Sequence, residues 1–315
     1  MGTPRGGDAA AAGTADALAA YAADVLGSVR RRDQRARAAG WLERLVLDGG
    51  AGHAAPRNLR YFVNRSPWDP APVQRRIAER VLPLLRPEAW VVEDVSFPKR
   101  GRLSVGVARQ FSAGLGRRAG CQVAVGVHAV APAASCPLRW RLFLNQEWAD
   151  DPERRQLARV PVGVGHREKW RLVLDVLDEL ADWGLRPPLL VADSAYGTGA
   201  DFRAGLTARG VPHLVGVHGE LTAHPGSLRP AAATGERGRG LLRYREPPRS
   251  VRALAESAGR AAYTRVDGPG APTGFLALRV RPAGARPRRL VREAAVAREG
   301  RWDGVLPAVG LLAEW

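Results

Sequence analysis

The sequence has very few cysteines and no long run of apolar residues. Cys121 and Cys136 are the only two cysteines among 315 residues. Their spacing matches neither a CxxC motif nor a zinc site, which argues against a disulfide-built secreted domain. Residues 1–20 are rich in Ala and Gly where a signal peptide needs a leucine-rich core, and no stretch of about 18 apolar residues could span a membrane. We therefore expect a soluble, cytoplasmic protein with reduced thiols and no membrane partner.

Lysine is almost absent, yet the chain is strongly basic. Lys99 and Lys169 are the only lysines, so nearly all of the 48 basic residues are arginine, and the net charge is +17. The arginine bias itself indicates a coding preference, but the positive excess persists whichever basic residue supplies it. Such an excess favours a polyanionic partner, because neutralising phosphates releases counterions and gives strong, salt-dependent binding. The composition therefore favours a nucleic-acid partner.

The hydrophobic pattern of the first ninety residues is helical. After a loose segment at 1–15, apolar residues at helical spacing predict two helices within 16–48 and a third over 66–85, where a proline lies near the start. We expect a helical region over residues 16–88 that could contact DNA.

From residue 90 the hydrophobic period changes to two, which is typical of strands. The pattern predicts an antiparallel meander of three strands and then alternating helices and strands, over the ranges 90–94, 103–111, 121–130, 168–184 (helix), 187–197, 201–210 (helix) and 212–219. Because such an order buries parallel strands between helices, we predict an α/β core over residues 89–219. Residues 220–315 are rich in Pro, Gly and Arg and predict a β-rich, basic insertion.

Two of the predicted strands run directly into acidic residues. The strand WVVED ends on Glu93 and Asp94, and LVAD ends on Asp193. If these strands are neighbours, Asp94 and Asp193 meet at one edge of the sheet, where two carboxylates repel unless a cation lies between them. Oxygen ligands of this kind suit Mg²⁺ or Mn²⁺, which can promote attack of a water or a 3′-hydroxyl on a phosphodiester. The alternative is that both carboxylates are capped or face solvent.

Basic residues follow the first acidic strand. Lys99 and Arg100 lie in the turn just after Asp94, and Arg117 and Arg118 lie in the next turn, AGLGRRAG. All four are candidates for DNA phosphate contacts, although exposed arginines are common throughout this chain. Glu93 is the more structural of the two adjacent acids, because neighbouring side chains on a strand point to opposite faces.

Several segments resemble the IS701-family insertion-sequence transposases of the DDE superfamily. The stretch VVEDVSFPKRGRLSVGVARQFSAGLGRRAGCQVAV resembles that family's first catalytic block. Further blocks follow in the family's order: SCPLRWRLFLNQEWADDPERR, HREKWRLVLDVLDEL and LVADSAYG. Upstream, SPWDPAPVQRRIAERV also matches, and the resemblance covers the chain from about residue 30 onward. The resemblance implies an RNase H-like mixed sheet flanked by helices, and a DNA transposase that uses Mg²⁺ or Mn²⁺ for strand cleavage and transfer.

The resemblance also implies site residues and partners. Asp94 and Asp193 match the first and second acids of the family's catalytic triad. The implied partners are double-stranded DNA, as terminal repeats and target, and further copies of the chain, and the implied location is the nucleoid.

The resemblance is incomplete in two places. The stretch at 45–63 looks shorter than the family's N-terminal helical region. The family's third acid is a Glu on a helix within a Tyr-Arg-Glu-Leu-Lys-type motif, which this sequence does not match, and Glu293, Glu299 and Glu314 lie in other contexts. We therefore expect a C-terminally truncated transposase that is impaired on its own. One alternative is a non-catalytic DNA-binding remnant, acting as a repressor or without function, and a weaker one is an unrelated metal-dependent nuclease.

Overall fold

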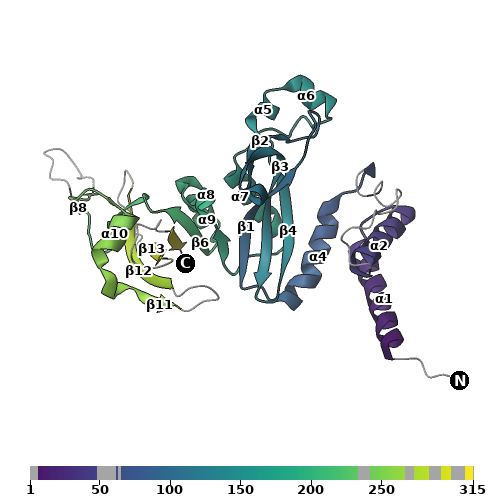
Figure 1. The fold of residues 1–315 in the computed structure, drawn as a ribbon, viewed down its shortest axis with the longest axis horizontal. Helices are drawn as coiled ribbons and strands as arrows, with labels where there is room; N and C mark the ends of the chain where they lie inside the picture. The colour runs from purple at the N-terminus through teal and green to yellow at the C-terminus, as the bar shows by residue number, and fades with distance from the viewer. Residues whose placement is uncertain are drawn as a thin grey trace. The chain divides into compact units, whose positions relative to one another are not determined.

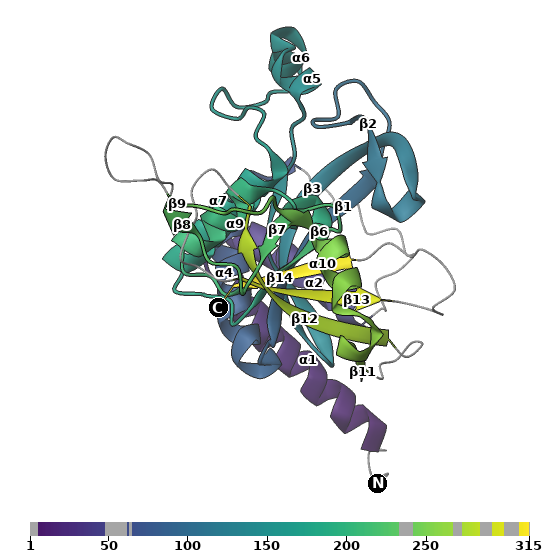
Figure 2. The same cartoon turned by 90° about the vertical axis from the view of Figure 1, so that its left-hand side faces the viewer.

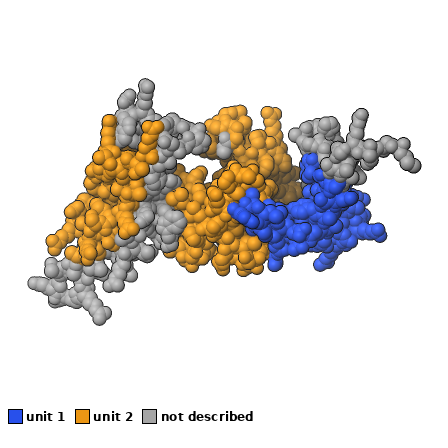
Figure 3. Space-filling model, turned by 90° about the horizontal axis from the view of Figure 1, so that it is seen from below, with its two compact units in different colours: residues 1–86 blue, residues 87–315 orange. Residues whose placement is uncertain are grey.

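The computed structural model describes residues 6–47, 62, 65–232, 242–266, 273–283, 292–298 and 309–314. The chain divides into two compact units, residues 1–86 and residues 87–315, which Figure 3 shows in different colours. The sequence pattern placed the change from helical region to core at residue 89. A further division of the second unit at residue 219 stays a prediction.

The first unit is helical and contains α1 (Gly6–Val25), α2 (Arg32–Leu47) and α4 (Pro70–Leu85). The end of α1 packs against α4, where Arg76 binds Asp24 at 2.7 Å, and the pKa of the Asp24 carboxyl is lowered mainly by its hydrogen bond to Arg76. The expectation of a loose segment over 1–15 is wrong for residues 6–15, which belong to α1. The alanines that made this segment look featureless are the best helix formers.

The second unit contains a mixed sheet with a characteristic strand order. The strands that form its core are β1 (Ala89–Pro98), β2 (Ala108–Ser112), β3 (Arg117–Ala131), β4 (Ala134–Leu142), β5 (Leu190–Ala192) and β6 (His213–His218). β3 pairs antiparallel with β1 and with β4, while β5 pairs parallel with β1 and with β6. Figure 1 shows β1, β3 and β4 side by side. This order, β4-β3-β1-β5-β6, is RNase H-like, so the predicted fold class is confirmed.

The pairing of the early strands differs from the predicted meander. β2 lies beyond β3 rather than between β1 and β3, and it starts at Ala108 instead of residue 103. The alternation in LSVGV suggested a strand, but Gly101 and Gly106 have φ of 119° and 78°, so the backbone turns there. A short 3₁₀ turn, η1 (Ala113–Leu115), joins β2 to β3.

Helices α7 (Lys169–Asp182) and α8 (Ser194–Gly197) pack on the sheet, and α9 (Ala200–Ala208) packs against both of them. The short helices α5 (Gln146–Ala149) and α6 (Pro152–Leu157) lie together beyond the end of the sheet, near β2 (Figure 1). Helix α7 packs against β3 and β4, and Glu179 on α7 forms ion pairs with Arg139 and Arg141 of β4. α7 and α9 lie side by side (Figure 2). Arg209, at the end of α9, donates two hydrogen bonds of 2.7 Å to Asp178 of α7.

The β-rich segment after β6 extends the same sheet. Its elements are β7 (Thr222–Pro225), β8 (Ala231–Ala232), β9 (Leu242–Arg243), β10 (Arg249–Ser250), α10 (Val251–Ala258), η2 (Arg260–Ala262), β11 (Thr264–Val266), β12 (Thr273–Pro282), β13 (Arg292–Arg298) and β14 (Val309–Glu314). β14 pairs antiparallel with β6, and the sheet continues through β13, β12, β7 and β10. The predicted β-rich character is therefore present, but the segment is continuous with the core sheet.

The two cysteines are buried in the second unit. Cys121 and Cys136 are both buried free thiols, and burial raises the pKa of the Cys136 thiol. Within the described ranges, none of the helices has the length and apolar character needed to cross a membrane.

Candidate metal and nucleic-acid site

Asp94 lies within β1, which continues to Pro98 past the predicted end at residue 94, and Asp193 directly follows β5. Val91 of β1 pairs in register with Val191 of β5. Counted from this pair, Asp94 lies three residues further along β1 and Asp193 lies two residues further along the chain from β5. Because the parallel pairing stops just before both residues, it brings the two acids to neighbouring positions at the edge where the parallel part of the sheet ends. Their role as metal ligands stays a prediction.

The Asp94 carboxylate is half-buried and both of its oxygens are engaged. Its side chain is 29% exposed, and Oδ2 lies 2.5 Å from Nζ of Lys169, the first residue of α7. Oδ1 accepts a hydrogen bond from the Tyr196 hydroxyl of α8. Glu93 is exposed and points to the opposite face, as strand alternation requires. Burial lowers the pKa of His128, and the charge of Glu93 partly offsets that shift.

Asp193 begins a helix instead of continuing a strand. β5 ends at Ala192, five residues before the predicted end. Asp193 is the N-cap of α8, and its Oδ1 accepts hydrogen bonds from the backbone N–H groups of Ala195 and Tyr196 at 3.0 and 3.4 Å. Asp and Ser after a strand are typical of such a cap, a signal that the apolar pattern concealed. The capping bonds use Oδ1 alone, so capping does not engage the whole carboxylate.

Tyr196 lies under the influence of both acids. Its pKa is strongly raised, first by burial, then by the charge of Asp94 and the hydrogen bond to it, and finally by the charge of Asp193. The phenol therefore stays protonated and can only donate its proton to Asp94 in a hydrogen bond. Tyr196 thus links the two acids, since its hydroxyl binds Asp94 and its backbone N–H binds Asp193.

The donor chemistry of this pair fits a hard divalent cation. Mg²⁺ takes oxygen ligands and commonly binds through one or two carboxylates while water and substrate phosphates complete its shell. Over the part of the chain that the structure describes, no group of three or more His, Cys, Asp or Glu side chains gathers to hold a metal. Asp94 and Asp193 thus fit a site that DNA phosphates or further ligands complete.

The late glutamates lie away from this edge. Glu314 of β14 pairs with His213, which is level with Leu190 at the start of β5, whereas the two acids lie beyond the other end of the parallel pairing. Glu293 pairs with Ala313, next to Glu314, at the same distant end. Glu299 lies outside the described residues.

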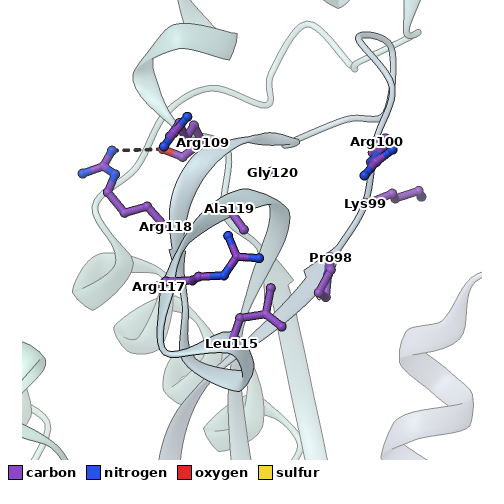
Figure 4. Close-up of a pocket in the computed structure, with 9 residues that line it drawn as sticks. All are labelled: Pro98, Lys99, Arg100, Arg109, Leu115, Arg117, Arg118, Ala119 and Gly120. Carbon is purple, nitrogen blue, oxygen red and sulfur yellow. Dashed lines mark hydrogen bonds between the residues drawn. The ribbon is translucent and has the colours of Figure 1, made fainter.

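The four basic residues nominated from the sequence line one cavity. A cavity of about 510 Å³ lies between the end of β1 and the β2–β3 hairpin, and its lining is Pro98, Lys99, Arg100, Arg109, Leu115, Arg117, Arg118, Ala119 and Gly120. In Figure 4, Arg117 points from the hairpin toward the side that carries Pro98, and Arg118 donates a 2.9 Å hydrogen bond to the Arg109 carbonyl. All nine of these residues are described, and no carboxylate is among them. Five exposed cationic side chains around one hollow attract phosphate strongly.

Buried contacts fix the loop that joins Arg100 of this cavity to β2. Arg154 of α6 is buried and donates to the carbonyls of Arg102 and Val107 at 2.7 and 3.1 Å. Its guanidinium lies 3.8 Å from the ring centroid of Trp148, and the Trp148 Nε1 also donates to Val107. The segment between two lining residues, Arg100 and Arg109, is therefore held in place. Pro98 is four residues beyond Asp94 on β1, about 13 Å along the strand.

Sequence reasoning missed three residues at these sites. Arg109 is one arginine among many, and nothing distinguished it before the hairpin brought it to the cavity. Tyr196 follows Asp193 closely in the DSAYG stretch, but its contact with Asp94 depends on the fold. Lys169 had one available signal, which is that lysine is nearly absent from this chain.

Comparisons with known proteins indicate where the chain belongs. A family model described as "DDE superfamily endonuclease" matches residues 15–270. A protein of Microchaete diplosiphon named "Probable transposase for insertion sequence element IS701" is 26% identical over 164 residues, a segment that covers 51% of this chain and 40% of that protein. The match thus spans about two fifths of the length of this relative.

Proposed function

The chain belongs to the DDE superfamily endonucleases, and on that premise we propose that it is a DNA transposase that cleaves and transfers strands at insertion-sequence ends. The observation that carries the proposal is the parallel pairing of β1 with β5, because it sets Asp94 and Asp193 at one edge of an RNase H-like sheet. The similarity to the IS701 relative supports a transposase rather than another nuclease.

In this proposal Asp94 and Asp193 hold Mg²⁺ or Mn²⁺ through their carboxylate oxygens. When bound, the cation polarises the phosphodiester and lowers the pKa of the attacking water or 3′-hydroxyl. Tyr196 orients Asp94 by donating to Oδ1. Lys99, Arg100, Arg117 and Arg118 bind backbone phosphates of the DNA, and the 13 Å between cavity and acids corresponds to about four base pairs of duplex.

We further propose that cleavage by this chain alone is weak. Two carboxylates hold a cation less firmly than three, and the described glutamates of β13 and β14 lie at the distant end of the parallel strands. The alternative function is a DNA-binding protein without catalysis, which could occupy the DNA ends that an active relative uses. The high positive charge supports DNA binding in either case.

A nicking assay on supercoiled DNA separates these functions. We expect the chain to bind DNA in a salt-sensitive manner and to nick it slowly in Mg²⁺ or Mn²⁺, with the nicking lost in Asp94→Asn. Asp182→Asn serves as the matched control, because this acid is exposed near the other end of α7 and should not affect nicking.

Each other outcome contradicts one part of the proposal. Rapid cleavage that Asp94→Asn abolishes would show that two described acids suffice and that the chain is not impaired. Nicking that survives Asp94→Asn would rule out the proposed site. Binding without metal-dependent nicking would favour the non-catalytic function, and nicks without joined strands at supplied DNA ends would favour a simple nuclease.

A further inference from the structure

Lys169 makes a direct ion pair with the first candidate acid. Its Nζ lies 2.5 Å from Asp94 Oδ2, and the same ammonium lies 5.3 Å from the ring centroid of Phe143. The Lys169 side chain is 34% exposed, so the contact is at the rim of the sheet and open to exchange. With Tyr196 on the other oxygen, Asp94 already has one positive and one neutral partner.

The position of Lys169 is unfavourable for the helix that carries it. It is the first residue of α7, where the helix dipole favours negative charge, and its N-cap, Glu168, forms no side-chain capping bond. A positive residue at this place lowers the stability of the helix unless another interaction compensates. The ion pair with Asp94 is such an interaction.

The chemical identity of the residue also matters. In a chain that uses arginine at nearly every basic position, one of its two lysines contacts Asp94 and the other, Lys99, lines the basic cavity. A lysine ammonium is a compact point charge on a flexible stem, whereas a guanidinium forms a planar, fixed fork with a carboxylate. A compact and mobile cation suits a carboxylate that must also accept another cation.

We propose that Lys169 is a positioning residue that holds Asp94 when no metal is present and must leave Oδ2 before a divalent cation can bind there. The inference depends on the proposed function, since it takes Asp94 as a metal ligand. Lys169 then has two effects: it keeps the half-buried carboxylate oriented toward the sheet edge, and it competes with the cation for that carboxylate.

The test is a titration of the full chain with Mn²⁺ in the absence of DNA, followed by electron paramagnetic resonance of the free ion. Lys169→Met should bind Mn²⁺ about tenfold more tightly than the wild type, because a competing charge is removed. Lys169→Arg should bind no more tightly than the wild type. Thermal unfolding provides a second readout: Lys169→Met should melt at a lower temperature without metal and show a larger upward shift on adding Mn²⁺.

The control is Arg167→Met, two residues before Lys169. This variant also removes one positive charge, but Arg167 pairs with Asp175 instead of Asp94. It should leave the Mn²⁺ affinity close to that of the wild type. Affinity that is unchanged or weaker in Lys169→Met, while Asp94→Asn still abolishes binding, would overturn this inference and leave the metal site standing. Mn²⁺ binding that does not depend on Asp94 in any variant would overturn both the inference and the proposed function.

Discussion

The combined variant Arg117→Ala/Arg118→Ala is expected to bind duplex DNA about 30-fold more weakly at roughly 0.1 M salt, with the slope of log K against log salt reduced by about 2. Both guanidinium groups belong to the cavity between β1 and the β2–β3 hairpin, where five cations lie around one hollow and the described lining contains no carboxylate. Each lost phosphate contact removes about one released counterion, so the affinity and its salt dependence should fall together. Fluorescence anisotropy of labelled duplex DNA at several salt concentrations measures both.

The matched control is Arg186→Ala/Arg245→Ala, which removes the same charge from two exposed positions outside the cavity. This pair should weaken binding only through the net charge, by about twofold, and should leave the salt slope nearly unchanged. If both double variants lose affinity equally, the cavity has no special role and the DNA recognises only the overall charge of the protein.

The second large effect is expected from Gly197→Ala, which should destabilise the protein by about 3 kcal/mol and disturb the acidic site. A Cβ on Gly197 would lie 2.1 Å from the Gly216 carbonyl oxygen and 2.7 Å from the Val215 Cβ. Both neighbours belong to β6 in the middle of the sheet, so the short helix α8 must move instead. Asp193 caps α8 and Tyr196 lies on it, so a displacement of α8 moves both of these side chains relative to Asp94.

Gly199→Ala provides the comparison two residues away. Its Cβ would lie 3.4 Å from the nearest atom, and the backbone φ of −68° accepts any residue. We expect a loss below about 1 kcal/mol for this variant in urea unfolding. Equal stability of the two variants would show that α8 is free to shift on β6, and that the packing of these glycines does not fix the position of Asp193.

Long, strongly periodic segments could be predicted from the sequence alone. The helix expected at 168–184 is α7, with six buried apolar residues. The strand expected at 212–219 is β6, where alternation and β-branched residues agree. The apolar runs before Asp94 and Asp193 were recognised for the same reason, and they led to the two candidate acids.

Elements that depend on turns or on distant contacts could not be predicted. The alternating LSVGV has the pattern of a strand but turns at Gly106, and no local signal placed β2 on the far side of β3. The end of β5 at Ala192 depends on the capping bonds of Asp193, which compete with the strand. The pairing of Lys169 with Asp94 joins residues 75 positions apart and exists only in the folded chain.

The most direct test of the central claim is whether Asp94 and Asp193 hold the same cation. Mn²⁺ binding by the full chain should be measured for the wild type, Asp94→Asn, Asp193→Asn and the double variant, because asparagine keeps the shape of the side chain and still caps α8. The account predicts that each single variant weakens binding at least about tenfold and that the double variant is hardly weaker than either, since residues that act on one ion are not additive. Mn²⁺ affinity that survives in either single variant, or losses that simply add, would contradict it.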